Sequence, residues 1–76
     1  MIKSDTLVKG QSLRIELQKV KDRLPSEVFA KLSNYPQGVW MGGFKMVDGN
    51  SFGLVLELSD GSTMWFFEDE LAEIIL

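Results

Sequence analysis

The sequence contains no cysteine and no histidine among its 76 residues. Without cysteine, neither a disulfide framework nor a thiolate metal site can stabilise so small a core. Without histidine, the usual general base, proton shuttle and commonest metal ligand are missing, which excludes most enzyme chemistry. The composition therefore favours a binding module without a cofactor or a metal over an enzyme.

Long apolar runs are also missing. Nothing approaches the ~20 apolar residues that a membrane span requires, and residues 1–5 are not followed by the apolar run of a secretory signal. A chain of this length buries only roughly 60% of the surface that it exposes when unfolded, so a large internal cavity is not expected. With 45% hydrophobic and 25% charged residues, the sequence is typical of one soluble globular domain.

Basic residues are absent from the second half of the chain. All eight lie at or before Lys45, together with four acids, which gives this segment a net charge of +4 (8 − 4). Residues 46–76 carry seven acids and no base, a net charge of −7. This asymmetry predicts two surfaces suited to different partners, unless folding interleaves the halves into one mixed, solvated surface.

Short alternating segments are what the sequence does contain. Leu13, Ile15 and Leu17 alternate with charged residues, as in a half-buried strand. The segments 39–46, 52–58, 63–67 and 71–76 predict four more strands, and the leucines of 52–58 share one face with Phe52. Glycines at 42 and 43 predict a bulge at a barrel corner, and Asp-Gly at 60–61 predicts a tight hairpin.

The segment 18–37 loses the alternation. Pro25 followed by Val28, Phe29 and Leu32 predicts a short helix over 25–32, and residues 68–70 make a one-turn break before the last strand. This order predicts a mainly β, small five-stranded SH3-like barrel over residues 11–76, with a short helix in the long loop after strand 1. Residues 1–10 are expected to form a flexible N-terminal arm.

Two motifs carry a resemblance to a known family. GFKMVDG at 43–49 and WFFEDEL at 65–71, together with KDRL at 21–24, resemble PetP, a small peripheral subunit of the cytochrome b6f complex in cyanobacteria and red algae. The similarity runs from about residue 10 to residue 71. It implies an SH3-like fold on the cytoplasmic (stromal) face of the thylakoid membrane, with no redox centre and no catalytic residue. Residues 33–37 depart from the family pattern, so partner contacts in that loop transfer least.

Aromatic side chains are the first candidates for partner binding. Tyr35, Trp40, Trp65 and Phe67 are too many for the core of so small a barrel if the strands alternate, and exposed Trp and Tyr are favoured interface anchors. The alternative is that the core covers one face of the sheet and the 25–32 helix covers the other.

Charged residues are the second candidates. Glu68, Asp69 and Glu70 form an acidic turn that suits a basic partner, a divalent cation or simply solvent. Lys19, Lys21 and Arg23 occupy every second position, so in an extended segment they would project together towards an acidic partner. A solvated loop and nucleic acid are the alternatives, and the overall acidity argues against nucleic acid.

These observations lead to one functional hypothesis and one rival. We expect a non-catalytic accessory subunit that docks on cytochrome b6f subunits, modulates photosynthetic electron transport and touches the membrane only through the complex. Isolated, the chain is expected to be monomeric, with no nucleic-acid partner. The rival is an SH3-like module of another photosynthetic complex that recruits ferredoxin or its reductase, with an acidic carrier bound by the three basic residues at 19–23.

Overall fold

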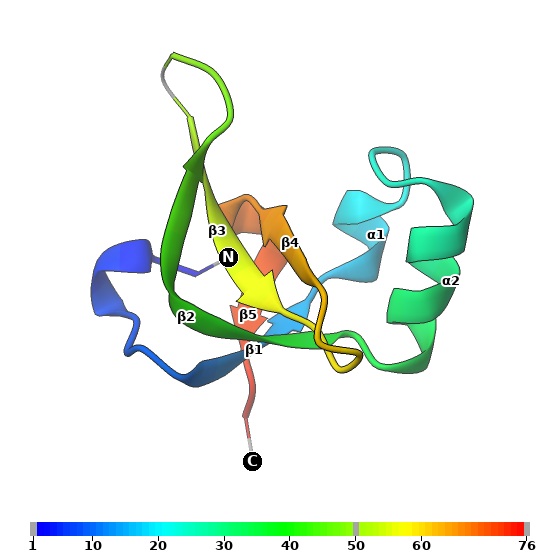
Figure 1. Cartoon of the computed structure of the whole chain (residues 1–76), viewed down its shortest axis with the longest axis horizontal. Coiled ribbons are helices and arrows are strands. Elements are labelled where there is room, and N and C mark those ends of the chain that lie inside the picture. Colours follow the sequence, from blue (N-terminus) through cyan, green and yellow to red (C-terminus); the bar gives the residue numbers. More distant parts are fainter. Residues whose placement is uncertain (1, 50, 76) are drawn as a thin grey trace.

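The computed structural model describes residues 2–49 and 51–75, which form one curved antiparallel sheet flanked by short helices (Figure 1). The strands follow the spatial order β4-β3-β2-β1-β5. Their bounds are β1 Gln11–Ile15, β2 Gln37–Met46, β3 Phe52–Glu57, β4 Thr63–Phe66 and β5 Leu71–Glu73. The helices are α1 Leu17–Val20 and α2 Ser26–Asn34, with 3-10 turns η1 Ser4–Thr6 and η2 Glu68–Glu70.

The mainly β, five-stranded fold predicted from the sequence is confirmed. The helix after Pro25, the hairpin at Asp60-Gly61 and the one-turn break at residues 68–70 are present as α2, the β3–β4 turn and η2. Strands β4 and β5 are the two edges of the described ladders. Closure of the sheet into a barrel therefore stays a prediction.

The first strand is shorter than predicted. It ends at Ile15, and Leu17 begins α1 instead of continuing the alternation. Leu17, Val20 and Leu24 follow one another at spacings of three and four, the period of a helix, and all three contribute to the core or pack against it. The last strand is also shorter, since β5 ends at Glu73 and the side chain of Ile75 is 91% exposed.

The predicted bulge is confirmed in β2. Trp40 lies opposite Leu56 but Phe44 lies opposite Leu54, so four steps along β2 match two along β3. Gly42 adopts a φ of +99°, a backbone conformation that residues other than glycine rarely adopt. Before the bulge β2 pairs with both β1 and β3, and after it β2 pairs with β3 alone.

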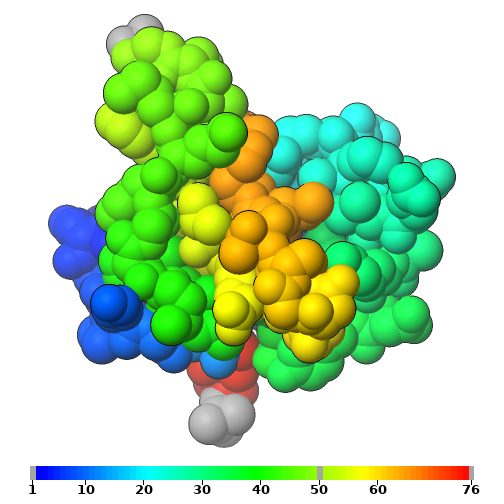
Figure 2. All heavy atoms as spheres, viewed as in Figure 1, coloured from blue at the N-terminus to red at the C-terminus, as the bar shows by residue number. Residues whose placement is uncertain are grey.

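This bend turns the far part of β2 and β3 into a projecting hairpin. In Figure 1 the two strands run together out of the body of the sheet, and in the space-filling view of Figure 2 they stand out from it. The core lies at the other end, between the sheet and the helices. Its fully buried side chains are Leu13, Ile15, Val20, Leu32, Leu54, Leu56, Phe66 and Leu71.

The described part of the N-terminal segment, from residue 2 onward, contacts the 3-10 turn η2. Ile2 is only 3% exposed, and its N–H donates to the carbonyl oxygen of Glu68 at 3.0 Å. The N–H of Ser4 donates to Oε2 of the same residue at 2.6 Å. The division of the chain at residue 10 stays a prediction, and these contacts tie the start of the segment to η2.

Candidate docking site

Four of the predicted binding residues meet in one cluster. Nε of Arg23 donates to Oε2 of Glu70 at 2.8 Å, and a second guanidinium nitrogen donates to Oε1. The guanidinium carbon lies 4.3 Å from the ring centroid of Trp65. Phe67 packs edge-on against that indole, with 5.0 Å between the ring centroids. We call Arg23, Trp65, Phe67 and Glu70 the arginine–aromatic cluster.

Burial of Glu70 explains why Arg23 is needed there. Glu70 is the last residue of η2 and is only 4% exposed. Its Oε1 also accepts the N–H of Phe67 at 2.9 Å, which caps the turn. A buried carboxylate is strongly unfavourable unless it is paired and hydrogen-bonded, and the two bonds from Arg23 meet that need. The pair therefore joins the chain after α1 to η2.

The indole of Trp65 is close to both Arg23 and the backbone of β3. A Cβ atom placed on Gly53 would come within 2.8 Å of Cε3 of Trp65, so only glycine allows the indole to lie this close. Arg23 also lies over this ring, and Trp65 is half-buried. Arg23, in the turn before α2, thus covers part of the indole, for which the sequence offered the 25–32 helix as the alternative cover.

The other two aromatic candidates lie in different environments. Trp40 is 8% exposed, and its Nε1–H donates to the carbonyl oxygen of Gly43 at 3.0 Å, so it braces the bulge from within the core. Tyr35 is 51% exposed at the end of α2, beside a shallow hollow that Gln37 and Leu58 also line. Tyr35 therefore lies outside the arginine–aromatic cluster.

The basic residues at 19–23 do not form the predicted row. That prediction assumed an extended segment, but residues 17–20 form α1 and residues 21–23 form a turn. Leu17 and Val20 are three residues apart, so both can pack against the core only if the segment is helical. Lys19 and Lys21 are exposed, whereas Arg23 faces Glu70.

The acidic turn is also divided by the fold. Glu68 and Asp69 are exposed, while Glu70 is buried. Within residues 2–49 and 51–75, no three His, Cys, Asp or Glu side chains are placed to hold a metal ion together.

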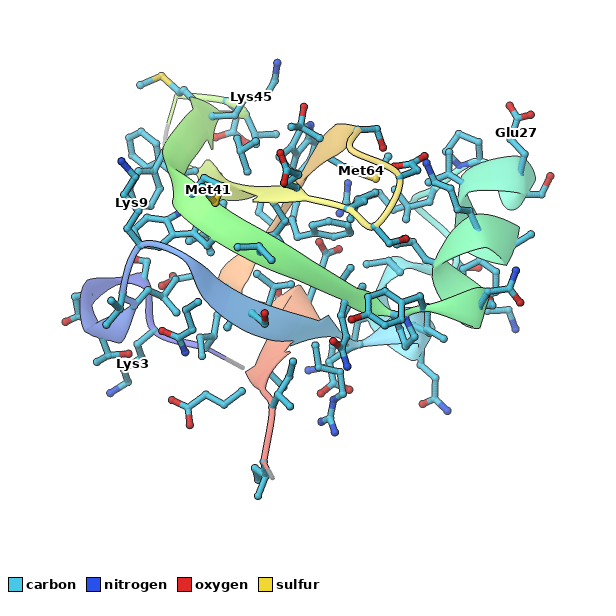
Figure 3. The ribbon with its side chains drawn as sticks, turned by 60° about the horizontal axis from the view of Figure 1, so that its bottom comes forward. Lys3, Lys9, Glu27, Met41, Lys45 and Met64 are labelled. Carbon is cyan, nitrogen blue, oxygen red and sulfur yellow. The ribbon has the colours of Figure 1, made fainter. Side chains whose placement is uncertain are left out.

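Folding interleaves the two oppositely charged halves of the sequence. Arg23 pairs with Glu70, and Lys31 on α2 pairs with Asp60 of the β3–β4 turn at 2.7 Å. The hydrogen bond from Lys31, followed by those from Ser62, holds the pKa of Asp60 well below its ordinary value. Lys3, Lys9 and Lys45 instead lie on the side of the molecule away from Glu27 of α2, spread from its bottom to its top (Figure 3).

Sequence reasoning missed a groove on the projecting hairpin. A hollow of about 550 Å³ is lined by Ser4, Phe44, Ser51, Phe52, Leu54 and Glu68. We call it the hairpin groove. Phe52 shares the face of Leu54, as predicted, but its side chain is 55% exposed. The reason is that β4 pairs only with Leu54–Glu57 and ends before it could cover Phe52.

One sequence signal points to this groove. The segments that become β2 and β3 are both longer than the segment that becomes β4, so the far ends of β2 and β3 cannot all be covered by β4. Phe44, Met46 and Phe52 belong to those ends, and each is more than half exposed.

The longest helix in the described part of the chain is α2, with nine residues, and none of the helices there is suited to crossing a membrane.

The fold defines a small, mainly β domain built on one curved antiparallel sheet. The chain belongs to the Tsr0524-like family of cytochrome b6f subunits, whose family model matches residues 9–72 of its 76 residues. The resemblance to PetP is thereby confirmed, and with it an association with the cytochrome b6f complex of photosynthetic electron transport. No curated protein and no solved structure matches the chain.

Proposed function

We propose that the chain is a non-catalytic accessory subunit that docks peripherally on the stromal face of the cytochrome b6f complex and modulates electron flow through it. The observation that carries this proposal is the family match over residues 9–72. The absence of histidine and cysteine from the sequence supports a role without a redox centre or acid–base catalysis of its own.

Exposure separates the predicted binding residues into two groups. Lys19, Lys21, Tyr35, Glu68 and Asp69 are exposed and are therefore available to a partner. Trp40 and the arginine–aromatic cluster hold the domain together through the contacts described above. We assign docking to exposed residues, with the buried candidates providing the shape on which docking depends.

Affinity purification tests the docking. A tagged chain recovered from solubilised thylakoids is expected to bring cytochrome b6f subunits with it. The matched control is a chain with the same tag and the Arg23→Met substitution, whose weakened fold should recover less. If the wild-type chain recovers no cytochrome subunit, the proposed function is wrong.

Modulation needs a kinetic measurement. In membranes that contain or lack the chain, the rate of cytochrome f re-reduction after a flash reports turnover of the complex. A changed rate at an unchanged content of the complex is expected. Equal rates in the two membranes would restrict the chain to a structural role.

A second candidate function is the recruitment of an acidic electron carrier such as ferredoxin, or of its reductase. The specific observation in its favour is that Lys19 and Lys21 are exposed and that the ion pairs of the described residues use Arg14, Arg23 and Lys31 instead. Titration with ferredoxin at low and high salt tests it, because added salt screens the attraction between the lysines and an acidic partner and so weakens binding. The double substitution Lys19→Gln and Lys21→Gln should abolish binding, with Lys9→Gln as control, and a flat wild-type titration at low salt removes this candidate.

A further inference from the structure

The hairpin groove combines an apolar wall with an open rim. Phe44 and Phe52 are 52% and 55% exposed, and the buried Leu54 forms the inner end of the groove. Phe44 lies opposite Leu54, and Met46 lies opposite Phe52. Directly opposite residues of an antiparallel pair have side chains on one face. The core face of the sheet therefore continues along the hairpin beyond the point where the rest of the chain covers it.

The backbone beside this wall is also open. Val47 N–H donates to the carbonyl oxygen of Ser51, and these two residues lie one position beyond the Met46–Phe52 pair that ends the β2–β3 ladder. By the alternation of antiparallel ladders, Phe52 directs its own N–H and C=O away from β2, towards the outer edge of β3. At that edge β4 pairs with Leu54–Glu57 and has no residue opposite Phe52. One extended segment can pair there.

The charge of the groove has one sign. Glu68 is the charged residue among those lining it, and the exposed Asp69 follows it in η2. One oxygen of Glu68 accepts the N–H of Ser4, which fixes the carboxylate at the rim. Lys45 is next to Phe44 in the sequence, but successive strand residues point to opposite faces, so it lies outside the groove.

We propose that the hairpin groove binds an extended segment of a partner subunit in which an apolar side chain stands next to a Lys or Arg. The apolar side chain packs between Phe44 and Phe52, the cation pairs with Glu68, and the segment's backbone pairs with the free edge of β3 at Phe52. Strand addition of this kind takes affinity from main-chain bonds and specificity from side-chain pockets.

This inference rests on the proposed function, because it names the chemistry of the segment that the complex presents. Loops of membrane proteins next to the bilayer on the cytoplasmic side are rich in Lys and Arg. An acidic, apolar groove complements such a segment. It does not complement the anionic headgroups of a lipid surface.

Binding of the full chain to isolated cytochrome b6f complex that lacks it tests the groove. Phe52→Ser is expected to weaken binding by about tenfold or more, as for a central interface anchor. Glu68→Gln is expected to weaken binding at low salt and to reduce its salt dependence. The matched control is Met41→Ser, because Met41 lies on the neighbouring strand β2 and is about as exposed, at 50%, but does not line the groove.

The outcomes separate the inference from the proposed function. If the wild-type chain does not bind the complex, the proposed function fails. If it binds, and Phe52→Ser and Glu68→Gln bind equally well with unchanged thermal unfolding, the groove inference is overturned while the function stands.

Photo-crosslinking identifies the occupant directly. With benzoylphenylalanine in place of Phe52, irradiation of the bound chain is expected to label a peptide of a complex subunit that carries Lys or Arg next to an apolar residue. Label on an acidic peptide, on lipid or on a second copy of this chain would overturn the inference.

Discussion

Arg23 and Glu70 are separated by 47 positions in the sequence, yet they make two hydrogen bonds with each other. Their side chains are 26% and 6% exposed. The attraction between them is therefore screened far less than that of the surface pair between Arg14 and Glu16, whose side chains are 54% and 32% exposed. At the scale of single residues, this pair is the strongest candidate for a stabilising polar contact.

Removal of one partner should be costly. Arg23→Met leaves the carboxylate of Glu70 buried without its ion pair, and we expect a loss of about 3 kcal/mol in the free energy of unfolding. The double substitution Arg23→Met and Glu70→Gln should recover part of it, which a double-mutant cycle in urea measures. Arg14→Met is the control, with an expected change below about 1 kcal/mol. Equal effects of the two arginine substitutions would contradict this role.

Asp60 gives a prediction for pH. Because the pKa of its carboxyl is lowered in the folded state, chiefly by the hydrogen bond from Lys31, protons bind the unfolded chain more readily. Its stabilising contribution is therefore complete above the unfolded value of about 3.9 and is lost as pH falls from there towards the lower folded value. Asp60 is exposed, so the effect on stability is small.

The titration of Asp60 is best followed by NMR of its side-chain carboxyl carbon. We expect a midpoint well below the ordinary value in the wild-type chain, and a rise towards that value in Lys31→Met. Lys19→Met serves as the control, since Lys19 makes no ion pair with the described acids. An unshifted midpoint in the wild-type chain would mean that the contact between Lys31 and Asp60 does not persist in solution.

At the scale of elements, β3 and β4 depend on a glycine. Trp65 packs against Gly53 with no room for a Cβ atom, and the guanidinium of Arg23 lies over the same indole. Gly53→Ala is therefore expected to destabilise the domain by about 1–3 kcal/mol, the usual cost of overpacking, although alanine would otherwise suit a strand better.

Gly43 provides the matched control for this substitution. It also lies in a strand, but a Cβ atom there would meet Val55 at an ordinary 3.6 Å. Gly43→Ala should change the midpoint of thermal unfolding little. A neutral Gly53→Ala would show that Trp65 can repack without loss.

At the scale of the whole molecule, the start of the described chain is held to its last helical turn. Ile2 is buried against the core, and its N–H bonds the carbonyl oxygen of Glu68 in η2. Ile2→Ala is therefore expected to lower the free energy of unfolding by about 2–4 kcal/mol, as for a large-to-small core substitution. Val8→Ala, at a side chain 68% exposed, is the control and should be neutral. If Ile2→Ala is also neutral in urea denaturation, residues 1–10 behave as the flexible arm that the sequence predicts.

What the sequence determined by itself is local. Alternating apolar residues, Pro25, paired glycines and Asp60-Gly61 act through the backbone within a few residues, so the strands, α2, the bulge and the hairpin turn were all predictable. The predicted element boundaries were wrong where the two-residue period of a strand runs into the period of a helix. Leu17 is the example, because it fits both the strand alternation and the helical spacing of α1.

Only the tertiary structure decided which of these side chains are available. Arg23 turns inward because Glu70 is buried by a distant part of the chain, and Trp40 is covered by the bulge that it braces. Phe52 stays exposed because the pairing of β4 with β3 ends at Leu54, before it reaches Phe52. Burial and pairing depend on contacts between segments far apart in the sequence, and no local pattern contains that information. For this reason we add the uncovered end of the β2–β3 hairpin, as a proposed docking surface, to the exposed residues of the predicted motifs.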